Sequence, residues 1–172
     1  MKKFLAALAA ATITLVGSLA VAQPVQAAVS DCPAPTSGMA NICLFEDPPY
    51  QVGGTHGYFR RTADQVWAAP NGCFNLNTQY WGDGSGIVGD YASSLVINSD
   101  PGIQAPDGYI INFYEWVNCN PSARQFHVQF TSAQYVAYIP YLSNINNRHA
   151  PVVYQNGSNF NDTIMSMSVH VL

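Results

Sequence analysis

Two glutamates stand directly after an aromatic residue at the end of an apolar run. Phe45-Glu46 closes the segment ICLFE, and Tyr114-Glu115 closes the segment INFYE. A pair of carboxylates is the machinery of many glycoside hydrolases, in which one is the acid and the other the base or nucleophile. Here both glutamates occupy the same place in a repeated phrase. We therefore interpret them as parts of a fold motif rather than as catalytic groups.

Other patterns typical of enzymes do not occur in this sequence. It contains no H-E-x-x-H and no C-x-x-C, and the segment GDGSG departs from G-x-S-x-G because Asp83 stands two residues before Ser85. The four histidines are scattered, and His127 and His170 fall on the polar phases of predicted strands. These observations predict a protein that is not an enzyme.

The first 27 residues have the pattern of a secretory signal peptide. A basic start at Lys2 and Lys3 precedes an apolar run over 4–22 and a small-residue cleavage pattern at Val25-Gln26-Ala27. Residues 28–172 then form a single secreted, extracellular domain. No later apolar run is long enough to span a membrane, so we expect no membrane partner after the signal is removed.

The expected mature chain is acidic. Residues 28–172 contain no lysine and only four arginines against ten Asp and Glu, which leaves a net charge of −6. Such a surface repels phosphate backbones, so we expect no nucleic-acid partner.

The expected mature chain also has an even number of cysteines. An even count in an exported protein indicates disulfides, here two. Four cysteines allow three different disulfide pairings. We favour the pairing in which Cys32–Cys43 closes a short loop and Cys73 pairs with Cys119.

Alternation of apolar and polar residues predicts a mostly β protein. The segments FHVQF (126–130) and MSMSVHV (165–171) alternate with a period of two, SSLVIN (93–98) and APVVYQ (150–155) read as further strands, and Gly- and Asp-rich turns separate them. The one clear helix signal is 61–70, with Thr62 as N-cap and Pro70 at the end. The segment 131–138 is ambiguous between helix and strand. Short strands with little helix favour a β-sandwich.

The chain reads as two related halves. After the two aromatic-Glu pairs, DYASSLVIN (90–98) aligns with NRHAPVVYQ (147–155). Each half then forms one Greek key, over about 42–98 and about 109–172, and two such motifs cover each other's apolar faces.

The segments CLFEDPPYQVGG and DYASSLVIN resemble the βγ-crystallin Greek key, in which an aromatic-Glu pair opens a folded hairpin and a later strand carries serine. Together with the leader DCPAP, they are most similar to the secreted bacterial proteins of peptidase inhibitor family I36. The resemblance covers about residues 32–98. It implies a disulfide-stabilised, all-β sandwich of two Greek keys.

The resemblance implies a non-catalytic inhibitor of an extracellular protease. An inhibitor needs a rigid exposed loop, whose conformational entropy is already reduced by folding before the protease binds. The segment DPPYQVGGTHG (47–57) suits this role, with Pro48, Pro49, Tyr50 and His56 as candidate contact residues. A plain hairpin tip explains the same residues, so the inhibitory role comes from the resemblance.

The resemblance also implies calcium as a candidate ligand, through the pattern [N/D]-[N/D]-x-x-[S/T]-S. In 89–94 the residues Asp90, Ser93 and Ser94 match, but Gly89 does not. In 146–151 the first two positions match, but Ala150-Pro151 replaces the hydroxyls. We therefore expect no cofactor, or at most weak calcium binding at Asp90 and Ser93.

A third hypothesis is a carbohydrate or cell-surface recognition module. Its candidate patch is TQYWGDGSG (78–86), which holds two adjacent aromatic residues, and Trp81 is the residue chosen to test it. Aromatic residues at β spacing more often belong to the core.

Overall fold

The computed structural model describes residues 32–36, 38–47, 58–84, 86–99, 108–131 and 136–172. The strands are β1 Asn41–Phe45, β2 Tyr58–Thr62, β3 Phe74–Asn75, β4 Ser94–Asn98, β5 Tyr109–Tyr114, β6 Gln125–Phe130, β7 Val136–Ile139, β8 Val152–Gln155 and β9 Ser166–Val171. Helical turns are the α-helix α2 Ala63–Trp67 and the 3-10 turns η1 Pro70–Gly72, η2 Val117–Cys119 and η3 Leu142–Asn144. The candidate inhibitory residues Pro48, Pro49, Tyr50 and His56 lie outside the described residues.

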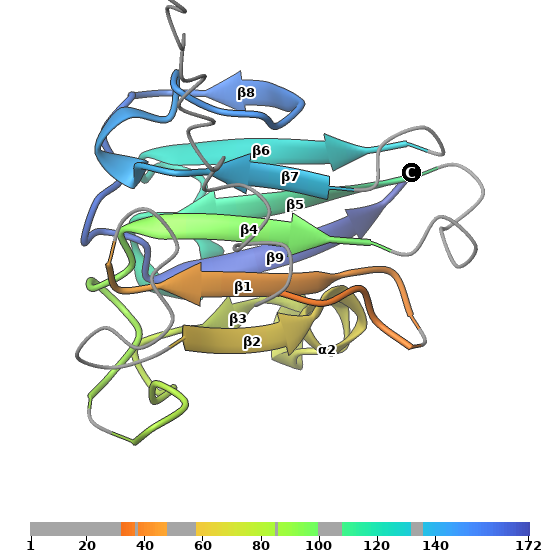
Figure 1. Ribbon diagram of the computed structural model, residues 1–172, viewed down its shortest axis with the longest axis horizontal. Coiled ribbons are helices and arrows are strands. Elements are labelled where there is room, and N and C mark those ends of the chain that lie inside the picture. The colour runs from red at the N-terminus through yellow and green to blue at the C-terminus, as the bar shows by residue number, and fades with distance from the viewer. Residues whose placement is uncertain (1–31, 37, 48–57, 85, 100–107, 132–135) are drawn as a thin grey trace, which may run out of the picture.

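The strands form two antiparallel sheets (Figure 1). The first sheet has the order β2-β1-β4-β7, and the second has the order β3-β9-β5-β6-β8. Each sheet therefore contains one strand from the other half of the chain: β7 lies in the first sheet and β3 in the second. The predicted all-β class with two sheets is confirmed.

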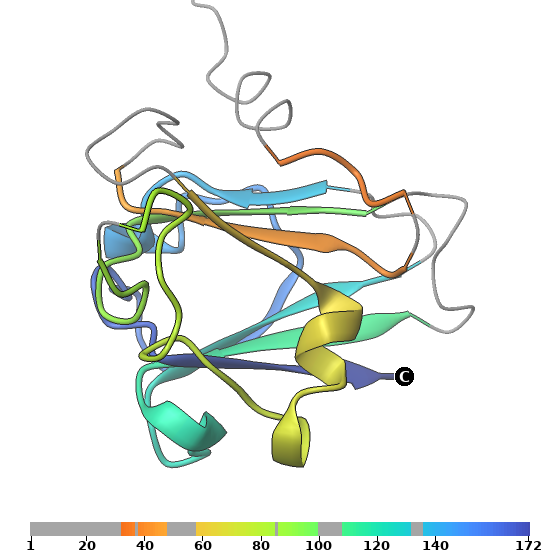
Figure 2. The same ribbon diagram turned by 90° about the horizontal axis from the view of Figure 1, so that it is seen from below.

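The core fills the space between the two layers, which Figure 2 shows edge-on. Strand β6 illustrates the period of two, because Phe126, Val128 and Phe130 are fully buried while His127 and Gln129 are only half-buried. Phe126 stacks on Phe113 of β5, with ring centroids 4.8 Å apart. The predicted alternation of 126–130 is confirmed.

Strands β1 and β4 are buried on both faces. Their inner side chains join the core, whereas Cys43, Phe45 and Val96 form a small outer cluster with Cys32. The leader covers this outer face: the Asn98 side chain donates to the Cys32 carbonyl at 2.8 Å, and the Asn41 side chain donates to the Pro33 carbonyl at 2.7 Å. Because both faces are covered, every residue of β4 is buried.

Helix α2 follows β2 and crosses between the two layers at one side of the sandwich (Figure 2). Thr62 caps it as predicted: its hydroxyl accepts from the Gln65 N–H at 3.2 Å, and the Gln65 side chain accepts from the Thr62 N–H at 3.0 Å. The ambiguous segment 131–138 ends in strand β7, and its residues 132–135 are not described.

The two halves repeat the same backbone contacts. Phe45 lies opposite Ser94, and Tyr114 lies opposite Ser166. The Ser93 N–H donates to the Phe45 carbonyl at 2.8 Å, and the Met165 N–H donates to the Tyr114 carbonyl at 2.9 Å. The counterpart of β4 is therefore β9.

The predicted alignment of 90–98 with 147–155 is therefore wrong. Strand β8 pairs with β6 at the outer edge of the second sheet rather than beside β5. Segments 150–155 and 165–171 both have strand character, and only the path of the chain decides which one returns beside β5.

The predicted alternation of buried and exposed side chains in 165–171 is correct in the middle of the segment and wrong near its ends. Met167 and Val169 are buried and His170 is exposed, as expected. Ser166, however, is fully buried, and Val171 is 40% exposed at the end of the strand. His127 lies on the predicted polar side of β6 but is partly buried rather than fully exposed. This burial lowers the pKa of its imidazole.

Both favoured disulfides are present. Cys32–Cys43 and Cys73–Cys119 have Cα–Cα distances of 5.9 and 5.8 Å. The first pair is fully buried under the leader, and the second joins the end of η1 to η2. Over the described ranges, no helix has the length and apolar character needed to cross a bilayer.

Candidate functional site

The strands that flank the candidate inhibitory segment, β1 and β2, are paired at the ends nearest to it. Phe45 ends β1 directly opposite Tyr58, which begins β2. Their rings stack with centroids 5.9 Å apart, and Phe45 is fully buried. Beyond β1, the Ser94 hydroxyl donates to the Asp47 carbonyl at 3.2 Å. Both ends of residues 48–57 are therefore attached to a packed sheet.

The predicted calcium residues Asp90 and Ser93 lie where the two halves meet. The Asp90 N–H donates to the Ile164 carbonyl at 3.2 Å, and the Asp162 N–H donates to the Ala92 carbonyl at 3.0 Å. Asp90 and Asp162 both have left-handed backbones, with φ of 66° and 52°. Asp and Asn tolerate this conformation better than most residues, which explains an acidic residue at each turn.

The structure adds two carboxylates to the predicted pair. Asp162 accepts the Ser93 hydroxyl at 3.2 Å, and a shallow pocket beside them includes Asp90, Glu115 and Asp162 in its lining. We call Asp90, Glu115 and Asp162 the acidic cluster. Partial burial, with the nearby Glu115 and Asp162 charges, raises the pKa of Asp90. The protonated form of Asp90 is therefore favoured relative to that of an isolated aspartate.

Within the acidic cluster, Glu115 forms an ion pair with Arg124. The Arg124 guanidinium donates to both carboxylate oxygens, at 2.9 and 2.5 Å. This hydrogen-bonded cation lowers the pKa of Glu115, so the carboxylate stays ionised while Asp90 is pushed toward protonation. The glutamate of the second aromatic-Glu pair is therefore held in an ion pair.

The sequence did contain a signal for the missed residue Asp162. The segment Asn161-Asp162-Thr163-Ile164-Met165-Ser166 matches the first, second and last positions of the calcium pattern, and it occupies the place equivalent to 89–94. The stretch 146–151, chosen instead, lies in the turn that leads to β8. There Arg148 donates to the Asn146 side chain at 3.1 Å.

The oxygen donors at the cluster are few. Within the described part of the chain, no three His, Cys, Asp or Glu side chains are grouped as metal ligands. Asp90, Asp162 and the Ser93 hydroxyl are hard oxygen donors, which fit calcium rather than zinc. Backbone carbonyls or water would have to complete a calcium shell, which fits weak binding.

The aromatic patch predicted at 78–86 is divided between core and surface. Trp81 is only 3% exposed and packs in the core, so it is the wrong residue to test a surface site. Its neighbour Tyr80 is 63% exposed. Neighbouring residues of an extended segment point to opposite sides, so one enters the core and the other faces solvent.

Comparisons with known proteins give no family assignment. No family model matches the chain, and no curated protein or solved structure matches it significantly.

Proposed function

We propose that this chain is a secreted, non-catalytic protease inhibitor that presents residues 47–57 to an extracellular protease. We further propose that its two sheets are interlocked Greek keys of the βγ-crystallin kind. The strand order supports this fold, because in each half the last strand returns beside the first while the third strand lies in the other sheet.

The observation that carries the inhibitor proposal is the anchoring of both ends of the segment. The paired and stacked Phe45 and Tyr58 fix its two ends on neighbouring strands. The buried Cys32–Cys43 disulfide holds β1 to the leader two residues before Phe45. Fixed flanking strands support this proposal, because a tight inhibitor requires a segment whose ordering on binding costs little entropy.

The test is a titration of residual protease activity. The oxidised protein lacking residues 1–27 is titrated against a thermolysin-like and a subtilisin-like protease. We expect stoichiometric loss of activity for one of them, and at least a tenfold weakening in Tyr50→Ala and His56→Ala. The matched control is Trp116→Ala, since Trp116 is 53% exposed on the equivalent connection of the second half.

Full activity of both proteases at micromolar excess of the protein would contradict the proposal for these two protease classes. Equal weakening by Trp116→Ala would contradict the choice of segment. In each variant the melting temperature is checked first, so that loss of inhibition is not confused with unfolding.

A second candidate function is weak calcium binding at the acidic cluster. The observation that favours it is the convergence of Asp90 and Asp162 with the Ser93 hydroxyl, contributed by corresponding turns of the two halves. These three residues would hold the ion, and calcium would offset the partial burial and the neighbouring negative charges that together raise the pKa of Asp90.

Thermal unfolding with and without calcium tests this candidate. A ligand that binds only the folded state raises the melting temperature. We expect millimolar calcium to raise it in the unmodified protein but not in Asp90→Asn, whose side chain still suits a positive φ. Asn147→Ala, in the stretch 146–151, serves as control and should respond like the unmodified protein. No response in the unmodified protein excludes the site.

A further inference from the structure

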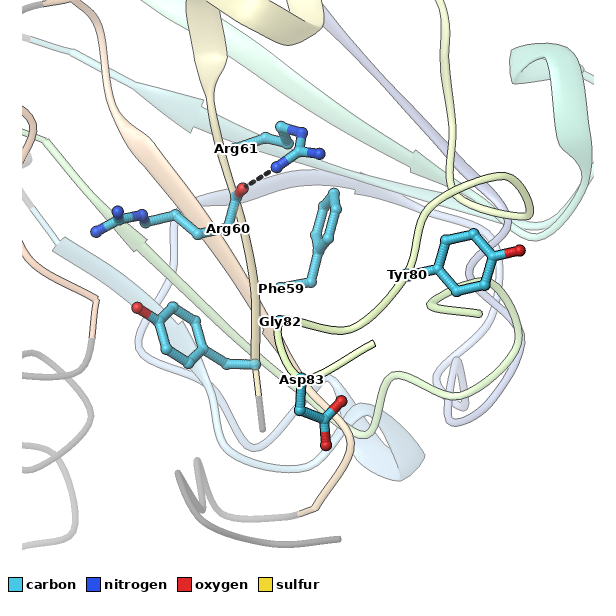
Figure 3. Close-up of a pocket in the computed structure, with 7 residues that line it drawn as sticks. Phe59, Arg60, Arg61, Tyr80, Gly82 and Asp83 are labelled. Carbon is cyan, nitrogen blue, oxygen red and sulfur yellow. Dashed lines mark hydrogen bonds between the residues drawn. The ribbon is translucent and has the colours of Figure 1, made fainter. Parts of the chain in front are cut away.

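Beside β2, at the edge of the first sheet, lies a groove that is distinct from residues 47–57 and from the acidic cluster (Figure 3). The groove is lined by Tyr58–Arg61 and by Tyr80, Gly82 and Asp83 of the facing loop. It contains two of the four arginines expected in the mature chain. We call it the β2 groove, and we propose that it binds a neutral oligosaccharide, with one pyranose ring stacked on Tyr80.

The loop that faces β2 is well anchored. Trp81 is buried in the core, and hydrogen bonds of 3.0 and 2.9 Å join its N–H to Gly86 and the Val88 N–H to Gln79. The Gly82 N–H donates to the Tyr58 carbonyl at 3.2 Å, and a Cβ at Gly82 would lie 2.9 Å from that oxygen. Only glycine therefore allows this close approach, which fixes the width of the β2 groove.

The guanidinium of Arg61 is positioned before any ligand arrives. It lies 4.7 Å from the centroid of the Phe59 ring and donates to the Gln79 side chain at 3.1 Å and to the Arg60 carbonyl at 2.8 Å. In Figure 3, Phe59 and Arg61 point to the side of β2 that faces Tyr80. A planar donor fork held in place loses little entropy on binding and suits neighbouring hydroxyl groups.

Tyr80 and Asp83 add an aromatic surface and a hydrogen-bond acceptor, which a sugar-binding site commonly uses. Tyr80 is 63% exposed, so its ring offers a flat apolar surface to the C–H face of a pyranose. The Asp83 carboxylate accepts hydrogen bonds from hydroxyls, and Arg61 donates them. Polar side chains beside an aromatic surface are typical of small-ligand sites.

Charge and backbone geometry argue against other ligands. The carboxylate of Asp83 and the overall charge of −6, from four arginines and ten acidic residues over 28–172, disfavour polyanions. A peptide added as a strand would need the outward carbonyls of β2. The carbonyl of Tyr58 already accepts from Gly82, and that of Arg60 accepts from Arg61.

Calorimetric titration of the oxidised protein without residues 1–27 tests the proposal, with chitohexaose, cellohexaose and hexagalacturonic acid as probes. We expect saturable binding of at least one neutral hexaose, a loss of at least tenfold in Tyr80→Ala, and near-complete retention in Tyr80→Phe, which keeps the ring. Tyr91→Ala is the matched control, because Tyr91 is 54% exposed and lies outside the β2 groove.

Three outcomes would overturn the proposal. They are no binding of either neutral hexaose at millimolar concentration, binding of the acidic hexamer alone, and binding that Tyr80→Ala leaves unchanged. These results are independent of protease inhibition, which is measured with separate variants in residues 48–57.

Discussion

The connections that follow β1 and β5 begin alike and continue differently. Each starts with a glutamate after an aromatic residue that ends a strand. In the second half, Glu115 pairs with Arg124 across the connection, and Cys119 within it forms a disulfide with Cys73. In the first half, the residue directly before β2 is Gly57 rather than an arginine.

The same backbone framework carries two connections of different composition. The backbone contacts that close each half are the same, as the paired hydrogen bonds of Ser93 and Met165 demonstrate. The connection 115–124 contributes a cross-link and an ion pair, and it therefore acts as a structural brace. The segment 47–57 has neither cysteine nor arginine, and it is the segment that we propose contacts a protease.

Removing each disulfide in turn should give the largest difference between the two halves. Cys73–Cys119 closes a separation of 46 residues and Cys32–Cys43 one of 11. Loop-closure entropy then predicts losses of about 4 and about 3 kcal/mol in the free energy of unfolding. Urea denaturation of the two double alanine variants measures both values. A larger loss for Cys32–Cys43 would mean that packing around its buried sulfurs outweighs loop length.

Alanine at the two equivalent buried serines should give a smaller effect. The Ser166 hydroxyl donates to the Trp116 carbonyl at 2.6 Å and accepts from the Cys119 N–H at 3.0 Å. The Ser94 hydroxyl donates to the Asp47 carbonyl at 3.2 Å. Because two partly buried backbone groups lose their partner, Ser166→Ala should cost about 2–3 kcal/mol in the free energy of unfolding. Ser94 is equally buried at the equivalent position, so Ser94→Ala should cost a similar amount. A loss below about 1 kcal/mol in urea denaturation of one variant alone would contradict the equivalence of the two positions.

Removing the ion pair of the brace should have the smallest effect. Glu115 and Arg124 are 23% and 42% exposed, so Glu115→Gln should cost only about 0.5 kcal/mol at pH 7 and less at high salt. Arg124 lowers the pKa of Glu115 in the folded state. The stabilisation is therefore complete above the unfolded pKa and disappears as the pH falls through the folded one.

Urea denaturation at pH 7 and at acid pH compares the unmodified protein with Glu115→Gln. The difference between the two proteins should vanish at acid pH. A difference that persists when the carboxylate is protonated would contradict an electrostatic origin.

Much of the fold was predictable because local patterns report local structure. The alternation in 126–130, the N-cap at Thr62 and the pairing of Cys32 with Cys43 were all predicted, and the structure confirms them. A period of two, a capping box and a short cysteine spacing each depend on residues close in the chain. The sites were less predictable: Asp90 and Ser93 were named and Asp162 was not, and within the predicted patch 78–86 Trp81 was chosen instead of the exposed Tyr80.

The sequence alone determined that this is an acidic, all-β chain with two disulfides and two related halves. Only the tertiary structure decided that β9 rather than β8 is the counterpart of β4, and that β3 and β7 exchange sheets. It also decided that Trp81 is buried and Tyr80 exposed, which places the β2 groove. The physical reason is that strand pairing and burial depend on residues far apart in the chain, and strands of similar pattern are interchangeable until the chain packs them.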